Sequence, residues 1–280
     1  MAGEFANPIL KYFRASKLPH IWCAGCGHGI VMGALVRAID KAGLDQDKTV
    51  VVSGIGCSSR APGYLNFDTL HTTHGRALAF ATGIKLARPE LNVIVVGGDG
   101  DIAAIGGNHL IHACRRNIDI TLVCFNNSIY GMTSGQYSPM TPTGKLATTA
   151  PYGNIDRPFD LCALAAASGA TYVARATSYH TTLLVDLIAK AIRHKGFAFV
   201  DALSQCPTYY GRRNKLGSAV EMMEMFRKIA VPVESAKKMT PEQLQGKVVI
   251  GEILNLEGVP EYTEEYRKLV ERAKGMSGNA

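Results

Sequence analysis

Five apolar segments rich in β-branched residues place the strongest limit on how this chain can fold. They occupy residues 49–55, 92–98, 119–125, 171–176 and 197–203. Their apolar residues are continuous rather than alternating, which is typical of strands covered on both faces. Segments with helical periodicity accompany them, at about 28–41, 74–87, 106–116, 158–168 and 178–195. This order predicts an α/β fold with a doubly wound, mostly parallel sheet.

The regular alternation of strands and helices weakens from about Pro207 onward. The last stretch, EYTEEYRKLVERAKG, has the pattern of a charged helix. We therefore expect two parts: a main domain over residues 1–206 that holds the functional sites, and a C-terminal arm or lid over residues 207–280. The arm is expected to pack on the same domain or on a partner subunit.

The charge balance of the chain suits anionic partners. Its 280 residues carry 30 Lys and Arg against 23 Asp and Glu, for a net charge of +7. The basic residues are dispersed and form only a few short clusters. This pattern disfavours nucleic-acid binding and suits an acidic protein partner or anionic substrates. The chain contains no run of about 18 apolar residues, and its start lacks the apolar segment of a signal peptide. We expect no membrane insertion and a cytoplasmic location.

Polar and glycine-rich loops follow three of the predicted strands, at residues 54–64, 97–108 and 126–136. Doubly wound sheets bind ligands where such loops leave the carboxyl ends of the strands. Asp99 lies in the second loop and Asn127 in the third, and carboxylate and amide oxygens suit Mg²⁺ beside a phosphorylated cofactor. Glycines would let the backbone approach a diphosphate. Either loop alone could be an ordinary turn, but together they favour a site for a metal ion and a diphosphate.

Seven cysteines, an odd number in a chain that we expect to be intracellular, argue against a disulfide framework. Three lie in apolar or helical stretches, where a thiol packs as a small apolar group: Cys114, Cys124 and Cys162. Four lie beside Gly, Ser or Pro: Cys23, Cys26, Cys57 and Cys206. The pair in WCAGCG is compatible with a thioredoxin-like pair, half of a zinc site or half of an iron–sulfur site. The solitary positions of Cys57 and Cys206 favour iron and sulfur over zinc, unless both are buried bystanders.

The stretch from Gly98-Asp99-Gly100 to Asn126-Asn127 resembles the thiamine diphosphate motif, which opens with GDG and closes with NN. The resemblance implies a thiamine diphosphate-binding fold of the pyrophosphate-domain type. It implies that Mg²⁺ is bound by Asp99, the Asn127 side chain and the Ile129 carbonyl. It also implies a set of residues that approach the diphosphate: Gly98, Gly100, Asp101 and Thr133. Thiamine enzymes need a second, pyrimidine-binding domain with an activating glutamate, and the chain has no room for one, so a partner subunit should complete the site.

Seven motifs in the same order resemble the beta subunit of the 2-oxoacid:ferredoxin oxidoreductases, from about residue 21 to residue 209. They are WCAGCG, GIGCSSR, HGRALAFATGIKLA, GGDGD, IGGNHLIHACRRN, NNSIYGMTSGQYSP and QCP. The chain is most similar to subunits of the enzymes that act on 2-oxoglutarate. The resemblance implies a four-iron, four-sulfur (4Fe-4S) cluster on Cys23, Cys26, Cys57 and Cys206. It also implies that the thiamine site is lined by Ile55, Gly56, Ser58 and His74.

The resemblance implies thiamine-dependent oxidative decarboxylation of 2-oxoglutarate, with coenzyme A as acyl acceptor and ferredoxin as electron acceptor, in a heterodimer or a dimer of heterodimers. Alternatives are the reverse carboxylation, the same chemistry on pyruvate or branched-chain 2-oxoacids, a nonredox thiamine lyase, and a zinc-stabilised binding module. Arg60 suits either a substrate carboxylate or a surface ion pair. His74 either faces the reacting groups or caps the helix that follows it. The cluster Arg212, Arg213 and Lys215 suits docking of an acidic ferredoxin.

Overall fold

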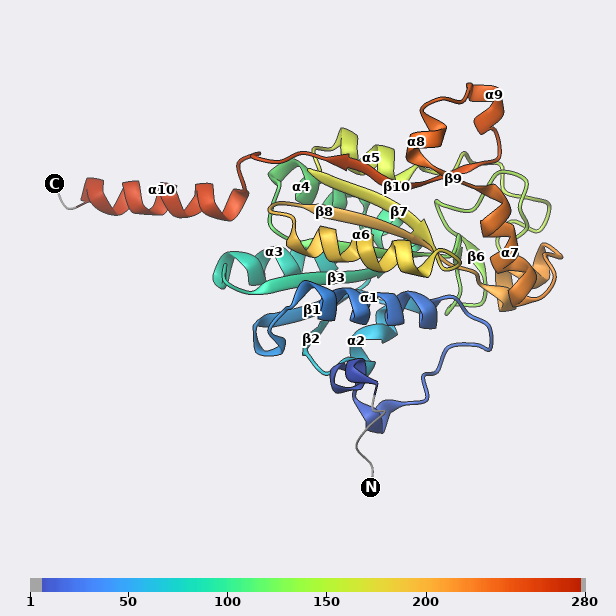
Figure 1. Cartoon of the computed structure of the whole chain (residues 1–280), viewed down its shortest axis with the longest axis horizontal. Helices are drawn as coiled ribbons and strands as arrows, with labels where there is room; N and C mark the ends of the chain where they lie inside the picture. Colours follow the sequence, from blue (N-terminus) through green and yellow to red (C-terminus); the bar gives the residue numbers. More distant parts are fainter. Residues whose placement is uncertain (1–6, 278–280) are drawn as a thin grey trace.

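Eight strands form one sheet in the part of the chain that the structure describes, residues 7–277 of a computed structural model (Figure 1). Their order is β2-β1-β3-β4-β8-β7-β10-β9, and all neighbours are parallel except β7 with β10. The predicted doubly wound, mostly parallel sheet is therefore confirmed. The strands are β1 (Thr49–Ser53), β2 (Asp68–His71), β3 (Asn92–Gly98), β4 (Thr121–Asn126), β7 (Tyr172–Thr177), β8 (Ala198–Leu203), β9 (Ala230–Pro232) and β10 (Val248–Asn255).

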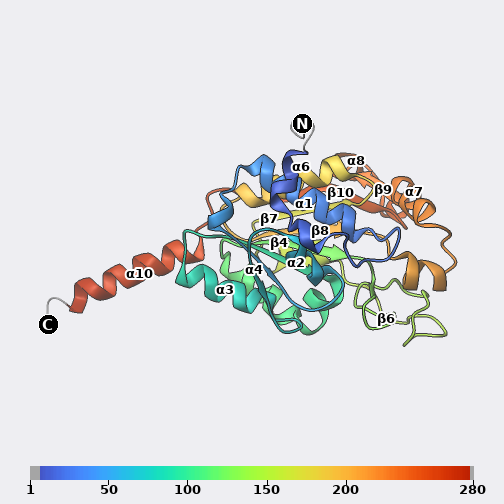
Figure 2. The same ribbon diagram turned by 90° about the horizontal axis from the view of Figure 1, so that it is seen from below.

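Helices cover both faces of this sheet (Figure 2). One face carries α1 (His28–Ala42) and α6 (Thr181–Arg193). The other face carries α3 (Ala77–Ala87), α4 (Gly107–Arg116) and α5 (Leu161–Ala167). The five predicted strands and five predicted helices are all present, with ends displaced by at most three residues. Short helical segments connect them: η1 (Pro8–Tyr12), η2 (Ala15–Lys17), η3 (Gln46–Lys48), η4 (Ser58–Arg60) and α2 (Ala61–Tyr64).

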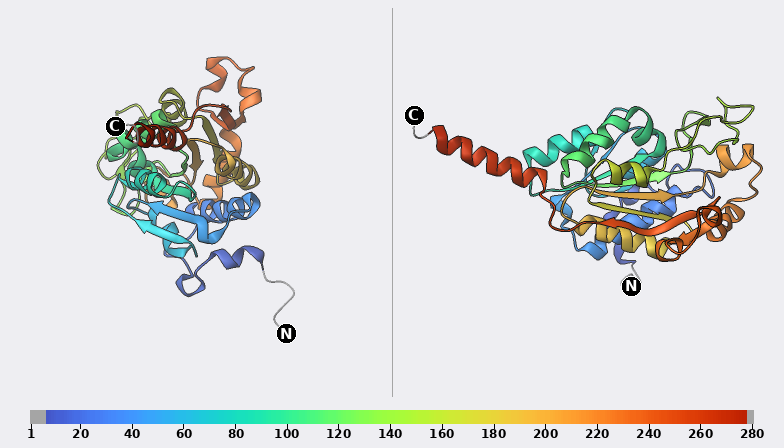
Figure 3. Two further views of the ribbon diagram at one scale, coloured as in Figure 1. Left: turned by 90° about the vertical axis from the view of Figure 1, so that its left-hand side faces the viewer. Right: turned by 90° about the horizontal axis from the view of Figure 1, so that it is seen from above.

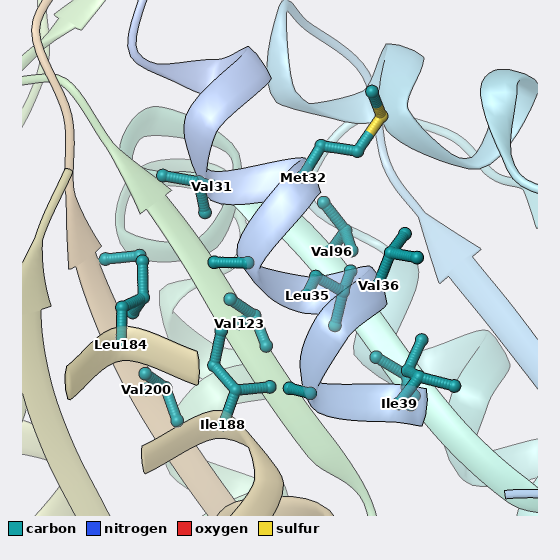
Figure 4. Close-up of a cluster of buried hydrophobic side chains, with 14 of the residues drawn as sticks. Val31, Met32, Leu35, Val36, Ile39, Val96, Val123, Leu184, Ile188 and Val200 are labelled. Carbon is teal, nitrogen blue, oxygen red and sulfur yellow. The ribbon is translucent and has the colours of Figure 1, made fainter. Parts of the chain in front are cut away.

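Aliphatic side chains join α1 and α6 to the middle of the sheet (Figure 4). Leu35 of α1, Ile188 of α6 and Val123 of β4 are fully buried in this layer. Leu122, which precedes Val123 in β4, is fully buried in the opposite layer, and so is Phe199 of β8. Successive residues of each strand therefore enter two different apolar layers, which explains why the apolar residues in the sequence are continuous.

The strands β1, β3, β4 and β8 end at the same edge of the sheet, the edge at which β6 and α7 lie in Figure 1. The register pairs Ser53 with Val96 and Gly98 with Phe125, so the loops that follow leave side by side. Two π-helical turns, η5 (Asp101–Ile105) and η6 (Pro207–Gly211), and a hairpin of β5 (Ile129–Tyr130) and β6 (Gln136–Tyr137) lie beyond this edge. Turns of this kind are frequent at functional sites.

The C-terminal region joins the sheet and then leaves it. It contains α7 (Ala219–Ile229), α8 (Val233–Ala236), α9 (Pro241–Leu244) and the strands β9 and β10, which extend the sheet beyond β7. The last helix, α10 (Tyr262–Ser277), projects away from the sheet in Figure 1 and in the right-hand view of Figure 3. Its base is anchored by the buried carboxylate of Glu261, which accepts hydrogen bonds from the backbone N–H groups of Asp119 and Thr263.

Residues 1–6, at the start of the predicted main domain, and residues 278–280, at the end of the predicted arm, lie outside the described residues. Among residues 7–277, no helix combines the length and the apolarity that crossing a lipid bilayer requires.

Candidate active site

A cavity of about 550 Å³ opens at the carboxyl edge of the sheet, within the size range of small-molecule and cofactor sites. The loops after β1, β3 and β4 and the β5–β6 hairpin form its walls. It brings together most residues that the sequence predicts for the cofactor and its metal: Ile55, Gly56, Cys57, Ser58, His74, Gly98, Asp99, Gly100, Asp101, Asn127, Ile129 and Thr133. Residues from segments far apart in the sequence thus share one concave site.

Oxygen atoms from the loops after β3 and β4 converge at one wall of the cavity. One terminal atom of the Asn127 side-chain amide lies 2.7 Å from the carbonyl oxygen of Ile129 and 3.3 Å from Oδ1 of Asp99. If that atom is the amide nitrogen, it donates a hydrogen bond to both oxygens. If it is the amide oxygen, it accepts a hydrogen bond from the Ile129 backbone N–H at 3.3 Å and lies beside two other acceptors, an arrangement that a cation would stabilise. Carboxylate, amide and carbonyl oxygens are ligands for hard divalent cations, so this set fits Mg²⁺.

Asp99 is held in a position that suits a charged partner. Its side chain is buried, and the hydroxyl of Ser138 donates a hydrogen bond to Oδ2. Burial raises the pKa of Asp99 to about 7, although the hydrogen bonds from Ser138 and from the Asn127 backbone act in the opposite direction. A cation bound to the same carboxylate would favour its ionised form and offset the effect of burial.

Two glycines keep the floor of the cavity free of side chains. A Cβ atom on Gly98 would lie 3.0 Å from Oγ of Ser58. A Cβ atom on Gly131 would lie 3.2 Å from Sγ of Cys57 and 4.0 Å from Sγ of Cys206. The floor therefore exposes backbone that a phosphate group can approach, and Gly131 lies between the cavity and two of the four selected thiols.

His74 and Asp101 lie together on the wall formed by the segment before α3. Nδ1 of His74 is 2.8 Å from Oδ1 of Asp101, and that oxygen also accepts a hydrogen bond from the Gly75 backbone at 2.7 Å. The helix α3 begins only at Ala77, and no side chain caps it. The alternative that His74 caps this helix is therefore wrong.

The four selected cysteines come together beside the cavity. Burial is the main cause that raises the pKa of Cys26 to about 12 and that of Cys57 to about 11, and the nearby Cys23 and Cys206 thiols add to both shifts. Backbone N–H groups also approach two of the sulfurs, from His28 at Cys26 and from residues 208–210 at Cys206. Such groups favour thiolates, and thiolates bind iron. The other three cysteines are buried in the core, as predicted: Cys114, Cys124 and Cys162.

Gln205 holds the segment before Cys206 against the loop that carries Cys23 and Cys26. Its side chain donates a hydrogen bond to the carbonyl of Gly25 at 3.0 Å, and its own carbonyl accepts one from the Gly27 backbone at 3.0 Å. The hydroxyl of Ser178 donates to the side-chain oxygen of Gln205 at 2.6 Å. This buried glutamine clamps the loop onto the end of β8.

Within residues 7–277, no three His, Cys, Asp or Glu side chains crowd around one point as they would for a single metal ion. A 4Fe-4S cube makes a different demand, because its four cysteine ligands bind at separate corners. The absence of such a single-ion group among these residues is therefore compatible with a 4Fe-4S cluster on the four thiols.

Comparison with known proteins identifies the family. Residues 54–202 match the thiamine pyrophosphate enzyme family, in its C-terminal TPP-binding domain. The 2-oxoglutarate synthase subunit KorB of Methanocaldococcus jannaschii is 56% identical over 96% of this chain and 99% of its own length. This chain belongs to the KorB family. The corresponding subunit of Methanothermobacter marburgensis is 54% identical over 96% of this chain and 94% of its own length.

A solved KorB-family structure supports the same conclusion. The 2-oxoglutarate:ferredoxin oxidoreductase from Magnetococcus marinus, with 2-oxoglutarate, coenzyme A and succinyl-CoA bound, superimposes with a TM-score of 0.85. It is 36% identical and covers 95% of this chain and 90% of its own. The predicted resemblance, the thiamine diphosphate-binding fold and the assignment to an oxidoreductase are therefore confirmed.

One of the two predicted catalytic residues stays outside the cavity of this KorB-family chain. Arg60 is exposed at the end of η4 and is not among the residues that line the cavity. Its positive charge lowers the pKa of Cys57, which opposes the effect of burial on that thiol. Arg60 therefore lies close to the cysteines, at the outer side of the loop that carries Cys57.

The sequence did not identify three residues that support the KorB-family site. Ser138 binds Asp99, Gln205 clamps the cysteine loop, and the hydroxyl of Tyr130 donates a hydrogen bond to the Gly100 carbonyl at 3.0 Å. Tyr130 and Ser138 lie within the motif NNSIYGMTSGQYSP, and Gln205 opens the motif QCP. Position within a motif is the signal that could have indicated them.

Proposed function

We propose that this chain is the thiamine-binding beta subunit of a 2-oxoglutarate:ferredoxin oxidoreductase. The enzyme converts 2-oxoglutarate and coenzyme A to succinyl-CoA and CO₂ and passes two electrons to ferredoxin, and the same site can run the reductive carboxylation. The observation that carries this proposal is the shared position of two sets of ligands. The side-chain amide of Asn127, which neighbours Asp99 and the Ile129 carbonyl, and the thiols of Cys57 and Cys206 all lie within 4.0 Å of the point that a Cβ atom on Gly131 would occupy. A nonredox lyase has no use for the thiols.

Mg²⁺ and the diphosphate of thiamine bind to the loops after β3 and β4 in this proposal. Asp99, the Asn127 side chain and the Ile129 carbonyl hold the metal. The proximity of the Asn127 amide to the Asp99 carboxylate and the Ile129 carbonyl, described above, supports that role. The remaining proposed cofactor contacts line the same cavity: Ile55, Gly56, Ser58, Gly98, Gly100 and Thr133. Asp101, which the resemblance also places at the diphosphate, lines it as well.

The 4Fe-4S cluster binds to Cys23, Cys26, Cys57 and Cys206. Raised pKa values show that burial makes free thiolates unfavourable at Cys26 and Cys57, and the positive charge of iron would offset this cost. When bound, thiamine diphosphate supplies the electron sink for decarboxylation, and the cluster accepts electrons one at a time. Because the thiols of Cys57 and Cys206 and the Asn127 amide all neighbour Gly131, the residues that would hold the two groups adjoin each other.

The side chains around the cavity bind, orient and shield the substrate. His74 presents its ring to the cavity, where the ring donates or accepts a hydrogen bond with the reacting groups. Arg60 attracts a substrate carboxylate at the outer rim, where a planar, permanently charged group suits an anion. Ile55 and Met132 give the walls apolar surface, which limits the access of water.

The active enzyme requires other chains. A partner alpha subunit supplies the pyrimidine-binding domain, in a heterodimer or a dimer of heterodimers, and ferredoxin docks near the cysteines. Residues 1–206 hold both cofactors, and residues 207–280 form an arm that follows them. The reaction takes place in the cytoplasm, where iron-binding thiolates stay reduced.

Anaerobic purification of the complex with its partner subunit tests this function. We expect reduction of methyl viologen that depends on both 2-oxoglutarate and coenzyme A, and slower reduction with pyruvate and branched-chain 2-oxoacids. Faster reduction with pyruvate would reassign the substrate. Activity of this chain without the partner would contradict the need for a second subunit, and a complex without iron and acid-labile sulfide would favour a nonredox lyase.

A further inference from the structure

The carboxylate of Asp101 is buried and enclosed by backbone. Oδ1 accepts a hydrogen bond from the Gly75 backbone at 2.7 Å and a longer one from the Ile55 backbone at 3.4 Å. A Cβ atom on Gly54 would lie 2.2 Å from Oδ2, so only glycine leaves room for this oxygen. The carboxylate is therefore fixed in one position by the segments after β1 and before α3.

The ring of His74 has one buried nitrogen and one open side. Nδ1 is fully buried and lies 2.8 Å from Oδ1 of Asp101, although its N–H is not aligned with that oxygen. Catalytic hydrogen bonds in ligand-free sites are often misaligned and tighten when the ligand binds. The side chain as a whole is 36% exposed and lines the cavity. The exposed part of the side chain therefore excludes Nδ1.

We propose that Asp101 is a positioning residue that holds His74 with Nδ1–H toward the carboxylate and Nε2 toward the cavity. This inference rests on the proposed function and deepens it. An ionised carboxylate can only accept, so it selects the Nδ1–H tautomer and leaves the lone pair on Nε2. Nε2 then accepts a hydrogen bond from a hydroxyl or thiol group of a ligand.

The same arrangement supports transfer of that proton. When the O–H or S–H bond of the ligand breaks, the proton forms a new bond with Nε2, and the ligand keeps the electron pair. The ring then carries a positive charge beside the fixed carboxylate, which stabilises it. Asp101 is poorly suited to contact a diphosphate directly, because two anions repel each other and Oδ1 already has partners. The role implied by the family resemblance, a contact of Asp101 with the diphosphate, is the competing assignment.

Asp101→Asn in the complete complex separates the two assignments. The amide has the same size and still accepts from Gly75, but it can turn its NH₂ group toward Nδ1 and select the wrong tautomer. We expect kcat to fall about a hundredfold, with wild-type KM values for the 2-oxoacid and coenzyme A and wild-type affinity for thiamine diphosphate. A loss of thiamine affinity whose effect on kcat disappears at saturating cofactor would overturn the proposal, as would an unchanged kcat.

His74→Asn provides a second test, because its short amide can still contact Asp101 but has no nitrogen at the Nε2 position. We expect it to lower kcat as Asp101→Asn does, and the double variant to be no slower than either single variant. Additive losses would overturn the proposal. His71→Asn is the matched control, since His71 binds Ser53 and does not line the cavity.

The tautomer of His74 can also be read directly in the wild-type complex, and His74→Asn is needed only to assign the signals. Ring ¹⁵N chemical shifts in histidine-labelled protein, assigned by the signals that His74→Asn removes, should show protonated Nδ1 and unprotonated Nε2. The opposite tautomer would overturn the proposal. The kinetic comparisons use whichever 2-oxoacid the wild-type complex oxidises, so an error in the proposed substrate does not affect their ratios.

Discussion

Asp99 and Cys206 are assigned to different proposed cofactors, so their variants should separate the two. Asp99→Asn keeps the size of the side chain but removes the negative charge beside the Asn127 amide and the Ile129 carbonyl. We expect magnesium-dependent binding of thiamine diphosphate to weaken about a hundredfold, or about 2.8 kcal/mol. The visible absorption of the cluster should be unchanged. Titration of the anaerobic complex with the cofactor measures the first quantity, and its spectrum measures the second.

Cys206→Ala is the reciprocal variant, and it should remove the cluster absorption while thiamine diphosphate still binds. Cys162→Ala is the matched control, because Cys162 is buried in the core and lies outside the set of four thiols. If Asp99→Asn bleached the cluster and Cys206→Ala abolished thiamine binding in folded complexes, the assignment of the two ligand sets would be wrong.

His28 makes the stability of the fold depend on pH. The ring is fully buried, and burial lowers its pKa to about 4, from an ordinary value of 6.5. Below pH 6.5 His28 binds a proton in the unfolded chain but not in the folded chain. Stability is therefore lost as the pH falls from 6.5 toward 4. We expect the free energy of unfolding to decrease by about 2 kcal/mol between pH 6.5 and pH 5 from this residue alone.

Denaturant unfolding at pH 7 and pH 5 measures this effect, as the difference between the wild-type chain and His28→Gln. The subtraction removes the contribution of other titrating groups. An equal loss of stability in both chains would show that His28 is not the source.

Single residues were predictable where they belong to a motif whose chemistry has few alternatives. Asp99 and Asn127 end adjacent buried strands, and the cavity that they line also receives Ile55 and His74. Ser138 was not predictable, because its hydroxyl reaches Asp99 only through the path of the loop after β6. Nothing about a serine in that segment indicates that its partner lies 39 residues earlier.

At the scale of elements, burial on both faces decided what the sequence could predict. The strands β1, β3, β4, β7 and β8 are nearly all buried, and all five were found from continuous apolar residues. The strands β2, β9 and β10 of this sheet were missed: β2 and β9, at its two edges, contain no buried residue, and in β10 only Ile250 is buried. Strands that are exposed or only partly buried do not give the long, continuous apolar runs by which the other five were found.

The clamp between β8 and the cysteine loop yields a prediction at this scale. Gln205→Ala removes the side-chain hydrogen bonds to Gly25 and Ser178, and the loss of such buried bonds costs about 1–3 kcal/mol. We expect the cluster to be lost faster in air, as followed by its visible absorption, while thiamine binding is retained. Gln245→Ala, at an exposed glutamine after α9, is the matched control. Equal rates of cluster loss in both variants would refute the clamp.

At the scale of the whole molecule, the positions of the two sites explain why the chain needs partners. The cavity is open at the carboxyl edge of the sheet, and large apolar side chains at its rim, such as Ile55 and Met132, are exposed. An exposed apolar rim around a cofactor site indicates a surface that another subunit covers. The sequence indicated this requirement only by the resemblance.

The fold shows where basic residues that contribute to the net charge of +7 lie, and this allows a specific prediction about ferredoxin docking. Arg212, Arg213 and Lys215 are exposed and directly follow η6, the turn that begins after Cys206. An acidic ferredoxin that docks there would approach the cluster from the surface nearest to it. Complementary charge raises the rate of encounter, and salt screens it over about 10 Å at 0.1 M ionic strength.

Arg212→Gln with Arg213→Gln should therefore lower kcat/KM for ferredoxin about tenfold at low ionic strength, with little change at high salt. Reduction of methyl viologen, which needs no docking surface, should keep its wild-type rate. Arg115→Gln with Arg116→Gln removes the same charge at the end of α4 and is the matched control. If both pairs changed the salt dependence equally, overall charge rather than this surface would attract ferredoxin, because only a docking site makes the position of the lost charge matter.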